Sequence, residues 1–335
     1  MQAAHTPVLL RECLEYLAPE GDGERLLVDA TLGEGGHAEA FLKNFANVQI
    51  IGVDSDPEIQ ARARERLSVF GNRVDFRTRW FDDFFAEYAG REVRAETAGV
   101  PAGNPEPDII LFDLGVSMFH YELSGRGFSF HKNEKLDMRL HPSAGITAAE
   151  LLDICSEKEV ADLLYHWGNE RYSRRIAAEI KENGKQASGT TIQLAKTVFR
   201  AVPESYRHRK IHPATKTFQA LRIAVNGELH RLESALPDAF SALKLGGKLG
   251  VITFHSLEDR IVKRFFRNLA KACVCFPEQP ICMCEGTPSA ELLTKKPVEA
   301  QKDECTGNAS ARSARLRVVR KLRSMNAERQ RCIIR

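Results

Sequence analysis

A glycine-rich turn follows the first apolar run of the chain. The run 26–31, LLVDAT, passes into the segment 29–37, DATLGEGGH, and a helix is expected after it. Glycines just after a strand let the backbone turn tightly near a ligand, and the first amides of the helix can bind a carboxylate. The next run ends at Asp54, a position suited to hold a ribose diol. An ordinary α/β turn is the alternative, since neither GxGxxG nor a phosphate loop occurs.

Another acid, Asp113, ends a further apolar run and begins the segment 113–117, DLGVS. Open α/β sheets bind ligands at the carboxyl ends of their strands. In enzymes that methylate amines, this position carries a polar residue beside the reacting nitrogen. The exocyclic amine of a nucleobase is a poor nucleophile, because its lone pair is delocalised into the ring. A carboxylate that orients this amine and accepts hydrogen bonds from its N–H groups would therefore assist the transfer of a methyl group. The alternative for Asp113 is a helix cap or turn.

A second polar group, His255 and Ser256 with Glu258 and Asp259, suggests a hydrolase triad. The close spacing and the absence of a GxSxG elbow argue against it. We expect this loop to line an RNA or base pocket. The alternative is that Ser256 caps a helix whose first turn holds the two acids.

Two further groups are candidates for RNA contacts. Lys216, Gln219 and Arg222 recur at helical spacing, which predicts a polar face for RNA or simply a solvated face. Arg126 and Phe128 are placed to cradle an extruded base, although Phe128 suits a core equally well.

Four of the eight cysteines lie in the segment 273–284, CVCFPEQPICMC, and the others are scattered. This is not the pattern of a secreted disulfide framework. Cys273, Cys275, Cys282 and Cys284 offer the four thiolates that zinc takes, although CxxC is the more usual spacing. Zinc and an inert reduced cluster both stay open. No metal is predicted for the candidate active site, because methyl transfer to an amine does not require one.

The composition suits a water-soluble protein with a sizeable core. The 335 residues are 43% hydrophobic, and the net charge of +3 decides little. Basic residues gather in the segments 171–175, 204–210 and 310–323, which suits a polyanionic partner or a solvated surface. There is neither an uncharged run of about 18 apolar residues nor a signal-peptide pattern. A cytoplasmic location is therefore expected.

Apolar runs alternate with helical patterns and predict a parallel α/β sheet. The strands are expected within 26–31, 48–56, 107–117 and 248–256. The stretch 131–215 has helical periodicity and almost no strand signal, so it is predicted to be a helical insertion. One long helix is expected over 217–243 and a loop over 285–310.

Eight segments occur together and in order, and as a set they resemble one family. The set resembles the ribosomal RNA small-subunit methyltransferase H family over about residues 5–320. The segments are HTPVLL, DATLGEGGH, DLGVS with RGFSF, LDMR, GNERYSRRIA, HPATKTFQALRIAVNGEL, FHSLEDRIVKRF and ARSARLR.

The resemblance implies a Rossmann-like class I methyltransferase sheet, dependent on S-adenosyl-L-methionine (SAM), with an inserted all-helical domain. It divides the chain into a methyltransferase domain over 1–130 and 216–320, a substrate-recognition insertion over 131–215, and a basic tail over 321–335. The implied reaction is methylation of N4 of a decoding-region cytosine in 16S rRNA, cytosine 1402 in the standard numbering. The implied partner is 16S rRNA, within the small subunit, and a homodimer fits the family.

The resemblance also carries site residues over to this chain. Asp113 matches the acid beside the methyl donor and is the predicted catalytic residue. His120 stands where the family usually has a glutamine at the cofactor, which puts that one contact in question. The predicted cofactor-binding residues are Gly35, Gly36, His37, Asp54, Phe81, Asp113 and His120.

Two other functions stay open. A methyltransferase of DNA is disfavoured, because N4-directed DNA enzymes usually carry a Ser-Pro-Pro-Tyr-like loop that this chain lacks. A non-catalytic SAM- or RNA-binding assembly factor is compatible with the change at His120, but the presence of Asp54 and Asp113 argues against it.

Overall fold

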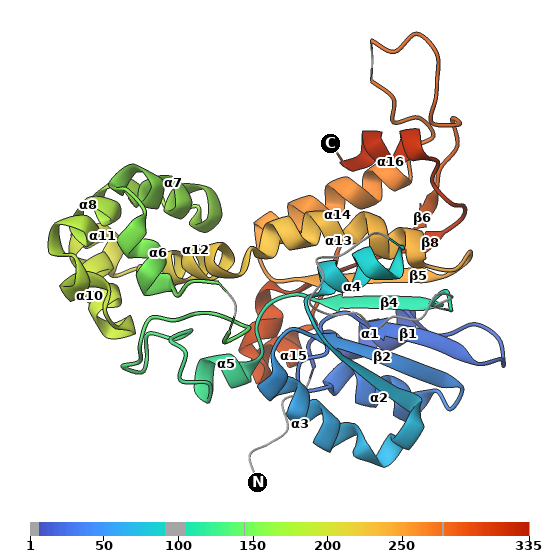
Figure 1. Ribbon diagram of the computed structural model, residues 1–335, viewed down its shortest axis with the longest axis horizontal. Coiled ribbons are helices and arrows are strands. Elements are labelled where there is room, and N and C mark those ends of the chain that lie inside the picture. Colours follow the sequence, from blue (N-terminus) through green and yellow to red (C-terminus); the bar gives the residue numbers. More distant parts are fainter. Residues whose placement is uncertain (1–6, 91–104, 144, 277, 335) are drawn as a thin grey trace. The chain divides into compact units, whose positions relative to one another are not determined.

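The computed structural model describes residues 7–90, 105–143, 145–276 and 278–334, and Figure 1 traces the chain. The chain forms two compact units. Unit 1 combines Met1–Gly115 with His230–Arg335 and contains the sheet, whereas unit 2, Val116–Leu229, is helical. No helix in the described part of the chain has the length and apolar character needed to cross a membrane.

The sheet of unit 1 has the strand order β3-β2-β1-β4-β5-β8-β6, and β7 also pairs with β8. The first five strands run parallel, while β8 is antiparallel to its neighbours. The strands are β1 (Arg25–Asp29), β2 (Val48–Asp54), β3 (Val74–Thr78), β4 (Ile109–Asp113), β5 (Lys248–Thr253), β6 (Ala290–Leu292), β7 (Val298–Glu299) and β8 (Arg315–Lys321). The predicted parallel α/β sheet and its four strands are confirmed.

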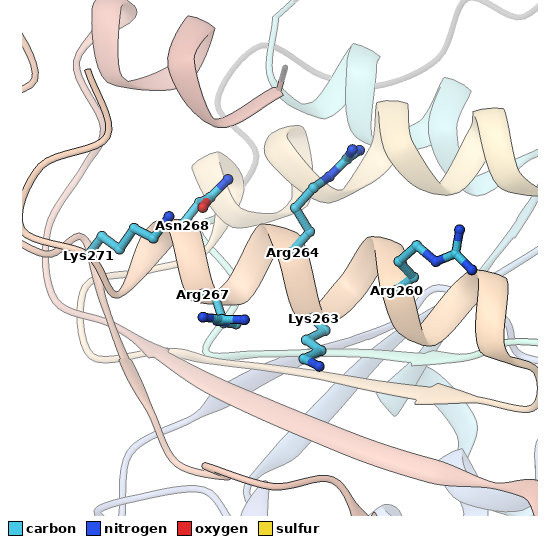
Figure 2. A pocket seen from close by; sticks show the side chains of 6 residues that line it. All are labelled: Arg260, Lys263, Arg264, Arg267, Asn268 and Lys271. Atoms are coloured by element: carbon cyan, nitrogen blue, oxygen red, sulfur yellow. The ribbon is translucent and has the colours of Figure 1, made fainter. Parts of the chain in front are cut away.

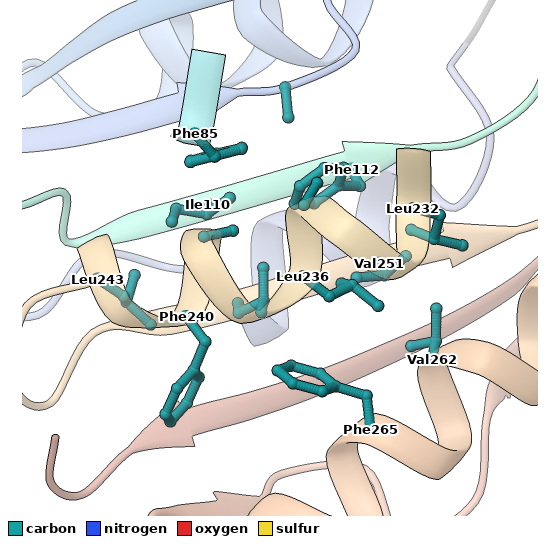
Figure 3. Packing of buried hydrophobic residues seen from close by; sticks show 14 of the residues in the cluster. Phe85, Ile110, Phe112, Leu232, Leu236, Phe240, Leu243, Val251, Val262 and Phe265 are labelled. Carbon is teal, nitrogen blue, oxygen red and sulfur yellow. The ribbon is translucent and has the colours of Figure 1, made fainter. Parts of the chain in front are cut away.

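Helices cover both faces of this sheet, which explains why its strands are apolar without alternation. Every residue of β5 is buried. On one face α4 (Phe81–Tyr88), α13 (Glu228–Ala242) and α14 (Ser256–Leu269) pack on β4 and β5, and Figure 3 shows residues such as Phe112 and Leu236 meeting there. The other core cluster includes residues of α1 (Leu10–Tyr16), α2 (Gly36–Asn44) and α3 (Pro57–Leu67).

Residues 315–321 of the basic segment 310–323 form the inner strand β8, and the prediction of a polyanion-binding or solvated surface is wrong for the buried cations of this strand, Arg317 and Lys321. Arg317 Nε donates to Asp259 Oδ1 at 2.7 Å. Lys321 Nζ donates to the carbonyls of Ser241 and Leu243 at 2.8 and 2.5 Å. A local pattern of charge could not reveal these partners, because they lie more than fifty residues away in sequence.

Unit 2 confirms the helical character predicted for 131–215. Thr147 and Thr190 cap two of its helices, and Ser156 caps a third through a capping box. The unit has a core of its own, built around residues such as Leu164 and Ile176. Its helices are α5 (Met118–Glu122), α6 (Ala148–Ile154), α7 (Glu157–Gly168), α8 (Ser173–Asn183), α9 (Lys185–Ser188), α10 (Thr191–Ala201), α11 (Glu204–Arg207) and α12 (Ala214–Asn226).

The single helix expected over 217–243 is instead two helices, α12 and α13. Gly227 ends α12 with φ of 63°, a left-handed conformation that glycine adopts without steric cost. The two helices contribute to different cores: Phe218 of α12 belongs to that of unit 2, and Leu236 of α13 to that of unit 1. Unit 2 therefore extends beyond the predicted insertion at both ends.

The C-terminal part of the chain is more ordered than predicted. The expected loop over 285–310 contains β6, β7 and α15 (Lys302–Gly307), followed by the 3-10 helix Ala309–Ser313. The residues of the predicted basic tail include the end of β8 and α16 (Ala327–Ile334). Another 3-10 helix, Ser68–Arg73, precedes β3.

Candidate active site

Three acids of unit 1 end neighbouring parallel strands. Asp29 ends β1, Asp54 ends β2 and Asp113 ends β4. The strand order reverses direction between β1 and β4, and open α/β sheets bind ligands at such a switch point. The structure thus brings Asp54 and Asp113 to one edge of the sheet, beside the turn that follows β1.

The glycine turn has a backbone that few other residues could adopt. Gly35 has φ of 77° and precedes α2 without any side-chain cap, so the first amides of α2 are not covered by a capping side chain. A Cβ on Gly35 would lie 3.0 Å from Leu67, and one on Gly36 would lie 2.5 Å from Pro7. The turn is therefore held close against its neighbours and exposes backbone donors at a helix start.

Asp54 ties the glycine turn to the end of β2. Its Oδ2 accepts the N–H of Gly33 at 2.8 Å, and its Oδ1 accepts the N–H of Asp56 at 2.9 Å. A carboxylate oxygen can accept more than one hydrogen bond, and Asp54 is only half-buried. The two bonds orient the carboxylate while leaving it able to accept hydroxyl groups.

The buried His37 forms an ion pair with Asp113, whose side chain is half-buried. His37 Nε2 lies 3.0 Å from the carbonyl oxygen of Val8, and Nδ1 lies 3.4 Å from Asp113 Oδ2. Both partners are acceptors, so the arrangement favours a His37 ring that carries a proton on each nitrogen. Burial alone would lower the pKa of His37, but hydrogen bonds to Asp113 and Cys13 and the charge of Asp113 together raise it well above its usual value.

This pair fixes one oxygen of Asp113 and leaves the other available. Asp113 Oδ1 is buried and has no hydrogen-bond partner in the part of the chain that the structure describes. The backbone N–H of Asp113 donates to Thr31 Oγ1 at 2.6 Å, which holds the end of β4 against the turn after β1. An unpaired buried carboxylate oxygen is costly and is typical of a position that meets a ligand donor.

The sequence analysis missed three residues around this pair, namely Cys13, Asp29 and Thr31. Asp29 is buried, and burial raises its pKa to about 7. Below this pH the carboxyl of Asp29 is neutral. The one available signal was an acid and a threonine within the strand end DAT, directly before the glycines.

Phe81 and His120 lie in different units. Phe81 begins α4 in unit 1, is half-buried, and meets Phe112 edge-on at 5.5 Å between ring centroids. His120 lies in α5 of unit 2, where its buried ring is 5.1 Å from that of Phe128. Cofactor contacts for both residues stay predictions.

Several candidates for RNA contacts have structural partners instead. Phe128 is buried in the core of unit 2, the alternative considered for it. Arg126 is buried and donates to the carbonyls of Arg139 and Leu140 at 3.3 and 2.8 Å, and its contact with a base stays a prediction. Arg222 pairs with Glu228 at 2.9 Å and is half-buried.

The group at 255–259 forms the start of α14. His255, not Ser256, is the N-cap, and it forms a capping box with Glu258. Asp259 instead pairs with Arg317. The alternative is confirmed for the two acids, which lie in the first turn of α14, but the predicted cap at Ser256 is wrong.

The fold and this edge define a Rossmann-type α/β protein with a candidate ligand site at the switch point of its sheet. Residues 2–322 match the model of the MraW methylase family, so the chain belongs to this family. The resemblance found in the sequence motifs is thereby confirmed.

Curated relatives extend over nearly the same length. A protein of Treponema denticola is 54% identical over 96% of this chain and 98% of its own. One of Treponema pallidum is 44% identical over 95% and 92%, and one of Borrelia turicatae is 43% identical over 95% and 98%. All three are named Ribosomal RNA small subunit methyltransferase H.

Proposed function

We propose that this protein transfers a methyl group from SAM to N4 of a cytosine in the decoding region of 16S rRNA, cytosine 1402 in the standard numbering. Membership of a methylase family and relatives named for small-subunit rRNA support the class of reaction. The observation that carries the chemistry is Asp113, whose Oδ1 is buried and unpaired at the switch point of the sheet.

The residues of unit 1 fit the cofactor. The N-terminus of α2 after Gly35 would bind the carboxylate of SAM, and Asp54 would accept hydrogen bonds from its ribose hydroxyls. Phe81 would lie against the adenine. When bound, SAM supplies a methyl group made electrophilic by a positively charged sulfur.

Asp113 would act on the amine. Its Oδ2 is held by His37, so its free Oδ1 has a defined direction. Accepting an N–H of the amine turns the nitrogen lone pair toward the methyl group and stabilises the positive charge that develops on nitrogen. The new N–C bond replaces the S–C bond, and the methylated amine then releases its proton to water.

Two groups of exposed cations suit a phosphate backbone. In unit 2, Arg171, Arg174 and Arg175 and the segment 208–210 are exposed. In unit 1, basic side chains project along α14 around a pocket (Figure 2). The residues that line it are Arg260, Lys263, Arg264, Arg267, Asn268 and Lys271. Each group would neutralise phosphates without reading base sequence.

The double variant Lys263→Gln with Arg267→Gln is expected to weaken RNA binding, because it removes two cations that would neutralise phosphates. The slope of log K against log salt should become shallower by about 0.7 to 0.9 for each phosphate that is no longer neutralised. The measurement is binding of a decoding-region RNA at several salt concentrations. Lys43→Gln on α2 is the control and should keep the slope of the parent protein. An unchanged slope in the double variant would place the phosphates elsewhere.

The direct test incubates the protein and radiolabelled SAM with small subunits from cells that lack this methylation. A parallel sample contains naked 16S rRNA. Label recovered as N4-methylcytosine at the predicted position supports the proposal. The sample that incorporates more label, subunits or naked rRNA, identifies the substrate. A cytoplasmic location, where ribosomal subunits are found, is part of the proposal, and size determination would test for a homodimer.

A non-catalytic assembly factor is the second candidate, favoured by His120 in place of the family glutamine. SAM binding without label in subunits, rRNA or DNA would support it and contradict the enzyme.

A further inference from the structure

Four cysteine thiols converge just after α14. They are Cys273, Cys275, Cys282 and Cys284, and their Sγ atoms all lie within 4.8 Å of one another. The distance from Cys273 Sγ to Cys282 Sγ is 3.8 Å, that from Cys282 to Cys284 is 3.6 Å, and that from Cys284 to Cys273 is 3.7 Å.

These separations match one coordination geometry. A disulfide would bring two sulfurs to about 2.05 Å, which none of the three distances approaches. Four thiolates placed tetrahedrally about zinc at about 2.3 Å lie about 3.8 Å apart. An iron–sulfur cluster is too large for the space, since its thiolates bind different irons. Three of the sulfurs therefore stand at the separations expected around a single tetrahedral metal ion, and Cys275 Sγ lies within 4.8 Å of each of them.

The backbone around the thiols is arranged to support negative sulfur. The N–H of Val274 donates to Cys284 Sγ at 3.4 Å, and the N–H of Gly286 donates to the same sulfur. The N–H of Cys275 donates to Cys273. Glu285 and Gly286 adopt φ of 66° and 63°, which turns the chain back so that the amide of Gly286 faces Cys284. Such N–H donors orient thiolate ligands and offset part of their charge.

We propose that Cys273, Cys275, Cys282 and Cys284 bind one Zn²⁺ ion. Four protein sulfurs leave no open coordination position, so the site is structural and takes no part in methyl transfer. Zinc fits because it accepts four soft thiolates in a tetrahedron and needs no redox chemistry. Binding releases the protons that remain on the four thiols to solvent.

The site would fasten a loop to the end of α14. Arg329 of α16 donates to the carbonyls of Ala272 and Cys284 at 3.0 and 3.3 Å. The metal would therefore link 273–284 into one body with α14 and α16. The zinc proposal does not depend on the methyl-transfer reaction. The zinc measurements can therefore fail or succeed whatever the methylation assay shows.

The first test measures metal in the intact protein. The full chain, purified without an affinity tag that binds metal, is expected to contain about one zinc per chain, in line with a closed four-thiolate site. Cys282→Ser should hold less than about a fifth of that amount. The matched control Cys155→Ser, which changes a half-buried free cysteine of unit 2, should keep its zinc.

A second test uses the parent protein and so does not depend on whether a variant folds. A zinc chelator should lower the melting temperature, and added Zn²⁺ but not Mg²⁺ should restore it. Cobalt bound in place of zinc should show the intense thiolate and tetrahedral absorption bands of a four-sulfur site. Three results would each overturn the proposal. They are four titratable thiols at the proposed ligands without bound metal, a disulfide among these cysteines, and iron in place of zinc.

Discussion

Asp113→Asn is expected to lower the rate of methyl transfer at saturating SAM by about two to three orders of magnitude, the usual cost of removing a group that stabilises developing charge. The amide keeps the size of the side chain. However, it loses the negative charge that pairs with His37 and that favours a cationic nitrogen. The measurement is single-turnover transfer to small subunits, with the dissociation constant of SAM determined in parallel.

The control for Asp113 lies at the other end of the same strand. Asp108 precedes β4, accepts the N–H of Leu26 at 3.0 Å and pairs with Arg25. Asp108→Asn should keep the parent rate, because the opposite edge of the sheet holds no part of the proposed site. A slower rate with unchanged SAM affinity assigns Asp113 to the amine, whereas a weaker affinity assigns it to the cofactor. A rate within a factor of three of the parent, together with an unchanged SAM affinity, would contradict both roles.

Arg329→Met is expected to lower the free energy of unfolding of unit 1 by about 3 kcal/mol. Arg329 is 2% exposed, and its guanidinium donates to backbone carbonyls at the end of α14 and in the segment that follows. The end of α14 has no further turn of helix to supply donors, so losing the guanidinium removes several hydrogen bonds at once, although Leu269 O keeps the N–H of Ser289 at 2.9 Å. The methionine would fill most of the volume without replacing the hydrogen bonds.

The measurement for Arg329 is urea unfolding followed by circular dichroism, with hydrogen exchange of 268–286 as the local readout. Arg331→Met on the same helix is the control, because the Arg331 side chain is 77% exposed and its ion pair with Glu328, at 3.5 Å, lies at the surface. Its effect should stay below about 0.5 kcal/mol. Equal stability of the two variants would show that the buried bonds of Arg329 contribute little.

Local patterns predicted the parts of the fold that depend on short stretches of chain. Strands covered on both faces are continuous apolar runs, so β1, β2, β4 and β5 could be predicted from composition alone. Glycines after β1 and acids at the ends of β2 and β4 then placed the site at one edge of the sheet. In the structure, Thr147 and Thr190 cap two helices of unit 2, which is a local effect of the same kind.

In two other segments, a stronger local pattern hid the signal that would have given the correct structure. The apolar periodicity of 217–243 continues across Gly227, which hid the break between α12 and α13. In β8, the alternating cations resembled a nucleic-acid contact, although the apolar residues between them are buried in the sheet. A charge pattern describes side chains one at a time and does not identify their partners.

The sequence by itself determined the class of fold, the edge of the sheet that holds the candidate site, and the acids Asp54 and Asp113. Tertiary structure alone decided the pairing of His37 with Asp113, the unpaired oxygen of Asp113, the burial of Arg329 and the convergence of the four thiols. The physical reason is that secondary structure follows from periodicity within a few residues. The state of a buried charge or thiol depends instead on groups that only folding brings within hydrogen-bond distance.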